Sequence, residues 1–111
     1  MASDDDLATH LQEVRRGTVV MASLLMLRTP GYGYALLEAL QHAGFDVDAN
    51  TLYPVLRRLE RQGLLDSRWS TEEPRPRKYY TASPDGLALA QVLLDDWRRL
   101  DGALRTLEER R

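Results

Sequence analysis

The amino-acid sequence predicts a mainly α protein with a small β-hairpin (α+β), arranged as a winged helix-turn-helix followed by one long C-terminal helix. Three observations predict this fold. Apolar residues recur every three or four positions in four separate segments. Two segments of strand-forming composition flank a short loop rich in proline and charge. The segment after residue 83 carries the most regular helical spacing in the chain.

Length and composition limit the classes of protein that remain. The chain has 111 residues, of which 43% are hydrophobic and none is cysteine. Such a length supports one domain with a modest core, and the missing cysteines exclude disulfides and thiolate metal sites. His10 and His42 have no partner ligand nearby in the sequence, so we expect no metal and no cofactor.

Neither a membrane span nor a secretory signal is expected. The longest apolar run, "VVMASLL", falls far short of the roughly 20 residues that cross a bilayer. The chain begins with the acidic stretch "MASDDDLATH", whereas a secretory signal begins basic and continues into an apolar stretch. We therefore expect a cytoplasmic protein without a membrane partner.

The first expected helix covers residues 7–28. We expect residues 1–6 before it to be disordered. A second apolar row at Val20, Leu24 and Leu27 indicates burial on more than one side. The stretch "TPGYG" then ends the helix, because proline and glycine continue a helix only at a cost. The main apolar row of this helix is Leu7, Leu11, Val14, Thr18, Met21 and Leu25.

Two shorter helices follow and predict a helix-turn-helix. The first, residues 34–43, has an apolar side of leucines and ends before Gly44, a residue type common just past a helix. For the second, Asp48 serves as N-cap and Gly63 marks the end. Its expected buried stripe is Leu52, Val55 or Leu56, and Leu59.

A hairpin and the last helix complete the chain. The segment "LLDSRWST" alternates in polarity, "RKYYTAS" is rich in strand formers, and "EEPRP" between them predicts the loop. Ser83 as N-cap and Pro84 at the first helical position then start a helix that runs to the C-terminus.

The last helix predicts a homodimer. A helix of about 27 residues spans roughly 40 Å, which is longer than a core of this size can cover. Its far end therefore needs apolar cover from elsewhere, most simply from a second copy of the chain. The expected dimer seam consists of Ala90, Leu93, Trp97, Leu100, Leu104 and Leu107.

Positive charge is concentrated in the middle third of the chain. The formal net charge is −2, yet residues 51–80 carry seven basic against four acidic residues, while residues 1–50 carry three against seven. Such an asymmetry is typical of a protein that meets an anionic partner with one face.

The second short helix has the properties of a DNA recognition helix. The major groove admits one α-helix, whose first residues meet base edges while later basic residues grip phosphates. Pro54 lies on the side of this helix opposite its leucines and has no backbone N–H that would lose its water on DNA binding. For each basic segment alone, the alternative is an ordinary solvated surface. The side opposite the leucines carries Asn50, Thr51, Tyr53, Pro54, Arg57, Arg58 and Arg61, and the hairpin loop adds Arg75, Arg77 and Lys78.

Three segments also resemble the signature segments of PadR-type transcriptional regulators, in the same order and at the same separations. They are "RRGTVVMASLLMLRTPGYGYALLEAL", "TLYPVLRRLERQGLL" and "PRKYYTASPDG". The resemblance covers residues 14–107, and it departs from the family pattern at the "EEPRPR" wing tip and at Ala82-Ser83. It implies a homodimeric bacterial winged-helix repressor of the short subgroup, whose single C-terminal helix pairs with the first helix of the partner.

The resemblance also implies roles for individual residues. Tyr32, Tyr34 and Tyr53 would lie near DNA phosphates, and Lys78 and Tyr79 would lie in the wing. Trp97 would occupy the dimer seam, where it could bind a flat hydrophobic effector together with Leu93 and Leu100. The alternative for Trp97 is that it only fills the seam.

The sequence therefore predicts a transcriptional regulator, a homodimeric repressor that binds a pseudo-palindromic double-stranded DNA operator and is released by a small molecule. Residues 1–83 would form the DNA-binding domain and residues 84–111 the dimerisation helix. The alternative is a winged-helix adaptor that binds only protein, whose arginines would be tied up in ion pairs such as Arg57 with Glu60. An enzyme with catalytic residues is not expected, because neither histidine has a nucleophile in a matching motif and Asp95 and Asp96 point apart on a helix.

Overall fold

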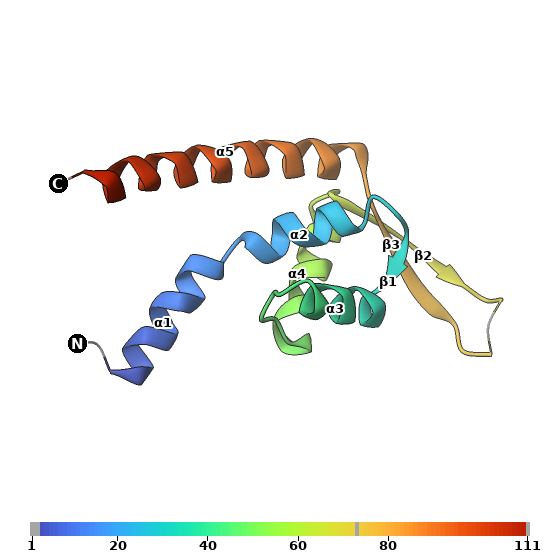
Figure 1. Ribbon diagram of the computed structural model, residues 1–111. Coiled ribbons are helices and arrows are strands. Elements are labelled where there is room, and N and C mark those ends of the chain that lie inside the picture. Colours follow the sequence, from blue (N-terminus) through green and yellow to red (C-terminus); the bar gives the residue numbers. More distant parts are fainter. Residues whose placement is uncertain (1–2, 73, 111) are drawn as a thin grey trace.

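The computed structural model describes residues 3–72 and 74–110 and confirms the predicted winged helix-turn-helix with a long C-terminal helix (Figure 1). Within this part of the chain, helices and strands follow the order helix, helix, strand, helix, helix, strand, strand, helix. They are α1 (Asp4–Arg15), α2 (Thr18–Met26), β1 (Gly31–Tyr32), α3 (Gly33–His42), α4 (Ala49–Arg61), β2 (Leu65–Ser70), β3 (Arg77–Ala82) and α5 (Pro84–Glu109).

The single first helix expected over residues 7–28 is wrong, because the chain breaks it at Gly17. This glycine has φ +87°, a left-handed conformation that interrupts a right-handed helix and separates α1 from α2. The expected disorder is also wrong for residues 4–6, which form the first turn of α1. Ser3 caps this turn by accepting the Asp6 N–H at 3.2 Å. Residues 1–2 lie outside the described part.

The predicted helix-turn-helix is formed by α3 and α4. Asp48 caps α4 as expected, since its Oδ1 accepts the Thr51 N–H at 2.9 Å. The buried stripe of α4 is Leu52, Leu56 and Leu59, so that Leu56 and not Val55 fills the middle position. Gly63, with φ +74°, then turns the chain from α4 towards β2.

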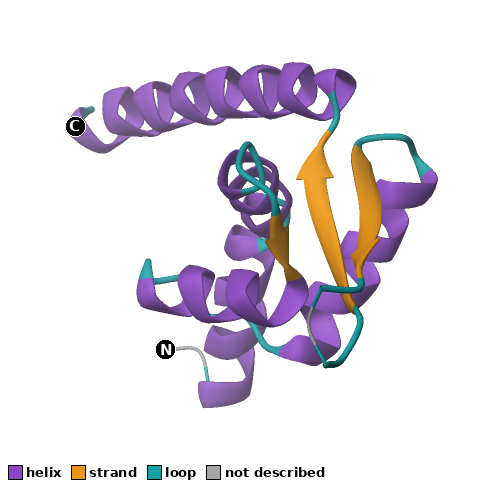
Figure 2. Ribbon diagram, turned by 90° about the vertical axis from the view of Figure 1, so that its right-hand side faces the viewer, coloured by secondary structure: helices purple, strands orange, loops and turns teal. Residues whose placement is uncertain are grey.

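The predicted hairpin is present, but the sheet has a third strand. Strands β2 and β3 pair antiparallel, and β1 pairs with the other side of β3 through Gly31 with Tyr80 and Tyr32 with Tyr79. Strand β3 is therefore the central strand (Figure 2). At the end of β3, the Ala82 N–H donates to the Leu27 carbonyl oxygen at 2.8 Å. This hydrogen bond connects the sheet to the end of α2.

The core lies where α2, α3, α4 and the start of α5 meet the base of the sheet. Leucines dominate it, in keeping with the three- and four-residue spacings of the sequence. Ser23 Oγ is also buried there and has no hydrogen-bond partner in the described part of the chain. The most completely buried large side chains are Leu24, Leu27, Leu40, Leu52, Leu56, Leu59 and Leu65.

The start of α5 is fixed by hydrogen bonds to the end of α4. Ser83 Oγ accepts the Gly86 N–H at 3.0 Å, as the sequence predicted for an N-cap, and donates to the Gly63 carbonyl at 2.7 Å. The Ser83 N–H donates to the Leu64 carbonyl at 3.1 Å. Gly86 lies so close to this carbonyl that a Cβ atom would come within 2.0 Å of its oxygen. These contacts set the direction in which α5 leaves the domain.

The apolar stripe of α5 is divided between the chain's own core and solvent. Ala90 is 1% exposed and belongs to the core, so its assignment to the dimer seam is wrong. Leu93 is half-buried, whereas Trp97 is 47% exposed and Leu104 is 64% exposed. The same helix face thus packs within the chain up to about Leu93 and lies open beyond it.

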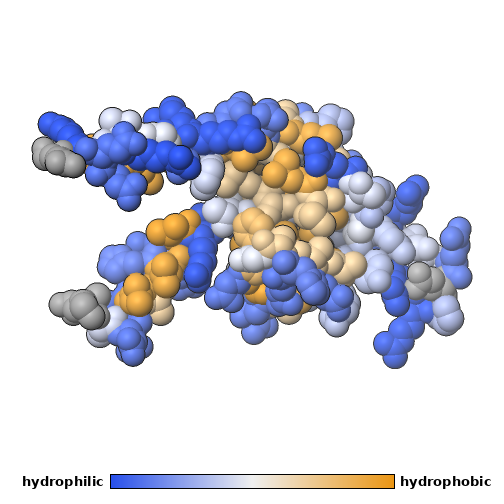
Figure 3. All heavy atoms as spheres, viewed as in Figure 1, coloured by the Kyte–Doolittle hydropathy of each residue, from blue (hydrophilic) through white to orange (hydrophobic). Residues whose placement is uncertain are grey.

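Helix α1 and the far half of α5 extend away from the rest of the molecule in the same general direction (Figure 1). The radius of gyration is 16.5 Å, against about 13 Å for a compact domain of this length. Helix α1 has no buried residue, and Val14 on it is 76% exposed. Its apolar side chains form an open row on the face seen in Figure 3.

Candidate nucleic-acid interface

The exposed side of α4 carries three arginines that form no ion pair with any residue of the described chain. Arg57, Arg58 and Arg61 are exposed and lie opposite the buried leucines of this helix. Within the described residues none of them forms an ion pair, because the only acid of α4, Glu60, binds Lys78 instead. The arginine pairing that an adaptor would have, such as Arg57 with Glu60, is therefore not found in this part of the chain.

The first turn of α4 carries small polar side chains that are exposed to solvent. Asn50 and Thr51 are exposed in the first turn, as a helix end entering a groove requires. Pro54 is also exposed, and as the sixth residue of α4 it removes a single intrahelical bond, the one to the Asn50 carbonyl.

Tyr53 joins α4 to the start of α3. Its ring lies against Gly33, where a Cβ atom would come within 2.6 Å of the Tyr53 Cε1 atom. A glycine at position 33 therefore lets the aromatic ring close the space between the two helices. The half-buried Tyr53 is consequently held in place, and it lines a groove together with Tyr32 and Tyr34.

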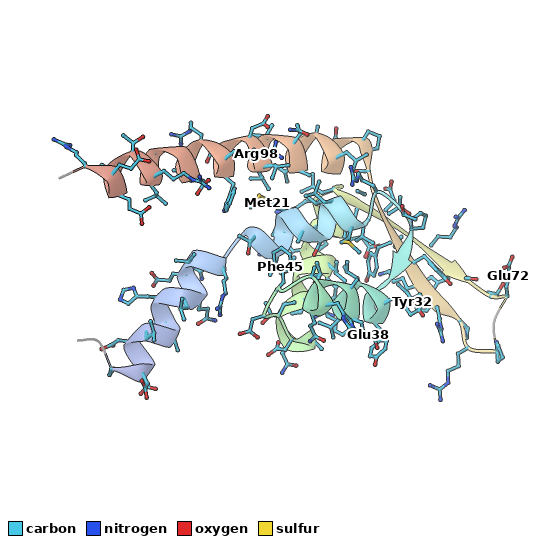
Figure 4. All side chains as sticks on the ribbon, in the orientation of Figure 1. Met21, Tyr32, Glu38, Phe45, Glu72 and Arg98 are labelled. Atoms are coloured by element: carbon cyan, nitrogen blue, oxygen red, sulfur yellow. The ribbon has the colours of Figure 1, made fainter. Side chains whose placement is uncertain are left out.

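Aromatic side chains also pack between β1 and β3, next to the start of α3. The rings of Tyr32 and Tyr79 meet edge to face with centroids 5.7 Å apart, and the Arg77 guanidinium lies over the Tyr32 ring at 4.6 Å. Tyr34 is exposed, and its hydrogen bond to the Glu38 carboxylate raises the pKa of the phenol. Figure 4 labels Tyr32, just before α3, and Glu38, within α3.

The wing, the hairpin of β2 and β3 with its loop, presents Arg75 beyond the sheet. Arg75 is exposed and lines the same groove as Tyr53 and Arg77, between the wing and the start of α3. Glu72 lies at the wing tip (Figure 4). The wing tip therefore combines both signs of charge.

Lys78 lies in the wing, as the resemblance implied, but on strand β3 and not in the hairpin loop. Its ammonium does not extend from the wing tip but points back to α4, where Nζ lies 2.8 Å from Glu60 Oε1. Ser67 on β2 donates a further hydrogen bond to Glu60 Oε2. Glu60 and Ser67 were not among the predicted site residues. The only signal in the sequence was a lone acid on an otherwise basic helix.

The helix-turn-helix and wing lie within a segment that matches a known protein family. Residues 23–91 match the transcriptional regulator PadR-like family, a range that includes α3, α4, the wing and the start of α5. The chain belongs to the PadR-like family of transcriptional regulators.

Relatives of this PadR-like regulator agree in sequence and in structure. A transcriptional regulator from Mycobacterium tuberculosis is 39% identical over 74 residues, which make up 67% of this chain and 66% of that protein. The chain thus matches slightly less than two thirds of that relative's length.

Solved structures extend the agreement to nearly the whole chain. A PadR family regulator from Eggerthella lenta DSM 2243 superposes with a TM-score of 0.89 at 44% identity, covering 97% of this chain and 96% of that one. A Streptococcus transcriptional regulator gives a TM-score of 0.75 at 29% identity, covering 87% and 98%. The relatives named here are all transcriptional regulators.

The PadR-like chain also presents a second surface, made of the open apolar sides of α1 and α5. Trp97 and Leu100 are each 47% exposed and lie next to the half-buried Leu93 on one side of α5. On α1, Leu7 and Leu11 are exposed as well. Apolar sides of this extent are typical of surfaces that bind another protein chain.

The described part of the chain contains neither a metal-binding cluster nor a membrane-spanning helix. Residues 3–72 and 74–110 contain no group of three or more histidine, cysteine or acidic side chains placed to hold a metal ion. None of the helices in the same residues has the length and apolar character needed to cross a membrane.

Proposed function

We propose that this PadR-like protein is a homodimeric repressor that inserts α4 into the DNA major groove. The observation that carries the proposal is the exposed side of α4, where Arg57, Arg58 and Arg61 have no acidic partner in the described chain. Three unpaired cations on a helix flanked by a wing fit a polyanion, because neutralising phosphates releases counterions and drives binding.

Within this proposal the two ends of α4 have different tasks. Asn50 and Thr51 in the first turn meet base edges, since Asn pairs well with adenine and Thr with several bases. The later arginines bind phosphates or guanine. Tyr32, Tyr34 and Tyr53 lie beside this end of the helix and contact the sugar-phosphate backbone, as do Arg75 and Arg77 in the wing.

The dimer is proposed to form through α1 and α5. The far half of α5 packs on α1 of the partner, which covers the exposed Trp97, Leu104 and Val14 together. Burying a leucine-sized side chain is worth roughly 1.5–3 kcal/mol, so several such side chains stabilise a dimer. A twofold axis then presents two copies of α4 to a pseudo-palindromic operator, with half-sites about one helical turn apart.

An effector site is proposed at Trp97, with Leu93 and Leu100 beside it. A flat hydrophobic molecule stacked there changes how the α5 helices pack, which changes the separation of the two α4 helices and releases DNA. Planar cationic dyes test this in a Trp69→Phe background, where Trp97 is the only tryptophan. Quenching on dye binding is expected, and the dye should no longer bind the Trp97→Phe variant. Equal dye affinity in both proteins refutes the site.

DNA binding is tested with a duplex selected from a randomised library by the full-length protein. Fluorescence anisotropy should show affinity falling steeply between about 50 and 200 mM salt. Replacing Arg57 and Arg61 by alanine should abolish specific binding while the dimer stays intact in sedimentation. An affinity that is independent of salt, or that survives both substitutions, favours the protein-adaptor function.

A further inference from the structure

Three polar side chains from three elements meet between the recognition helix α4 and the wing. Glu60 of α4 accepts a hydrogen bond from Lys78 Nζ of β3 at 2.8 Å and another from Ser67 Oγ of β2. Both carboxylate oxygens therefore have a donor. The side chains of Lys78 and Glu60 are only 30% and 31% exposed, so water competes with this pair less than at an open surface.

The cluster lies at the boundary between the anchored base and the open end of the hairpin. Towards the base, Leu65 and Tyr80 are buried in the core. Towards the tip, Trp69 pairs with Lys78 across the strands and is 62% exposed. In the described part of the chain, Glu60 thus forms side-chain hydrogen bonds from α4 to both strands of the wing.

We infer that Glu60, Ser67 and Lys78 set the position of the wing relative to α4, and that Lys78 serves DNA recognition by holding Glu60 and not by touching a phosphate. The inference rests on the proposed DNA-binding function. It assigns Lys78 and Glu60 as positioning residues. The hydrogen bond from Lys78 lowers the pKa of Glu60 and raises that of Lys78, which keeps both charged at neutral pH.

The charge of Glu60 gives the inference a sharp test. Removing a negative charge close to DNA strengthens binding if only long-range electrostatics matters. Removing a positioning residue weakens specific binding, because the wing and α4 no longer engage the operator together. Glu60→Gln is therefore expected to lower operator affinity by about tenfold, the order expected for losing a charged hydrogen bond. The control Glu72→Gln removes the same charge at the wing tip and should not lower affinity.

The salt dependence separates positioning from direct contact. A lysine that neutralises a phosphate contributes about 0.9 to the slope of log K against log salt. Lys78→Met should therefore weaken operator binding with the slope unchanged, and the double variant with Glu60→Gln should be no weaker than either single variant. Arg68→Met, which removes a cation from the neighbouring strand, should bind the operator as the unsubstituted protein does.

A measurement without DNA keeps this inference separate from the proposed function. In hydrogen exchange, Glu60→Gln should speed exchange of the β2 and β3 amides near the wing tip about tenfold, while the amides of α4 before Glu60 keep their protection. Unchanged wing exchange, tighter operator binding by Glu60→Gln, or a slope reduced by about 0.9 in Lys78→Met overturns the inference. If wing exchange changes but the protein binds no duplex, the proposed function is refuted. The inference that this cluster sets the position of the wing still holds in that case.

Discussion

Replacing Gly86 by alanine is expected to destabilise the protein strongly, although alanine is the better helix former. The new Cβ would lie 2.0 Å from the Leu64 carbonyl oxygen, 3.0 Å from its carbon and 3.3 Å from Leu24 Cδ2. The carbonyl cannot move away freely, because it accepts the Ser83 N–H at 3.1 Å. Relief of the clash therefore requires α5 to move away from the turn after α4.

The size of the effect follows from two opposing contributions. Alanine gains about 1 kcal/mol over glycine inside a helix. Overpacking, which forces side chains off their rotamers and shifts backbone, costs typically about 1–3 kcal/mol. Since the two nearest contacts are with the backbone of Leu64, the cost lies at the upper end of this range, and we expect a net loss of about 2 kcal/mol in the free energy of unfolding.

Thermal and denaturant unfolding at a fixed protein concentration measure this loss. A fixed concentration is needed because dimerisation contributes to apparent stability. Gly102→Ala is the matched control on the same helix, since nothing lies within 4 Å of its added Cβ, and it should stabilise by up to about 1 kcal/mol. A Gly86→Ala variant as stable as the unsubstituted protein would refute the close packing at this junction.

Three further perturbations test other parts of the structure. Ser23→Ala removes a buried hydroxyl without a partner in the described chain and should be neutral or stabilising by about 1 kcal/mol in thermal unfolding; a clear loss would show that the hydroxyl has a partner. Leu100→Glu with Leu104→Glu should give a folded monomer in sedimentation, because charges cannot be buried unpaired in the proposed α1–α5 contact, and a persisting dimer would place the interface elsewhere. A double-mutant cycle between Glu60→Gln and Lys78→Met should give a coupling of about 1 kcal/mol at pH 7. Since the pKa of Glu60 is lowered on folding, this coupling is fully present above the unfolded pKa of about 4.3 and is lost as the pH falls through the lower folded pKa, whereas the raised pKa of Lys78 keeps the coupling intact up to the unfolded lysine pKa of about 10.4. A coupling that does not change down to pH 3 would contradict the ion pair.

Local signals in the sequence were sufficient for most of the fold. Asp48 and Ser83 are N-caps in the structure as predicted, and regularly spaced leucines fill the core. Caps and periodic stripes depend on residues a few positions apart, so they can be read without knowing the tertiary structure. Strand β1 could not be read in this way, because two residues become a strand only by pairing with β3.

The other predictions that differ from the structure share one cause: a sequence pattern does not show which part of the molecule its residues contact. The three- and four-residue spacing continues across Gly17, so only the backbone conformation shows the break between α1 and α2. Ala90 shares a stripe with Trp97, and periodicity does not distinguish a stripe covered by the same chain from one open to a partner. Lys78 is basic and close to the wing, but its contact with Glu60 depends on how β3 packs against α4.

A hydroxyl-radical footprint on the selected duplex tests most directly whether two copies of α4 read successive major grooves. The proposed dimer predicts two protected blocks on one face of the DNA, centred about 10 base pairs apart. Both should be lost together in the Arg57→Ala, Arg61→Ala protein and in the monomer made by Leu100→Glu with Leu104→Glu. A single protected block, or two blocks that persist without these arginines, would contradict the assignment of α4 as the recognition helix of a dimer.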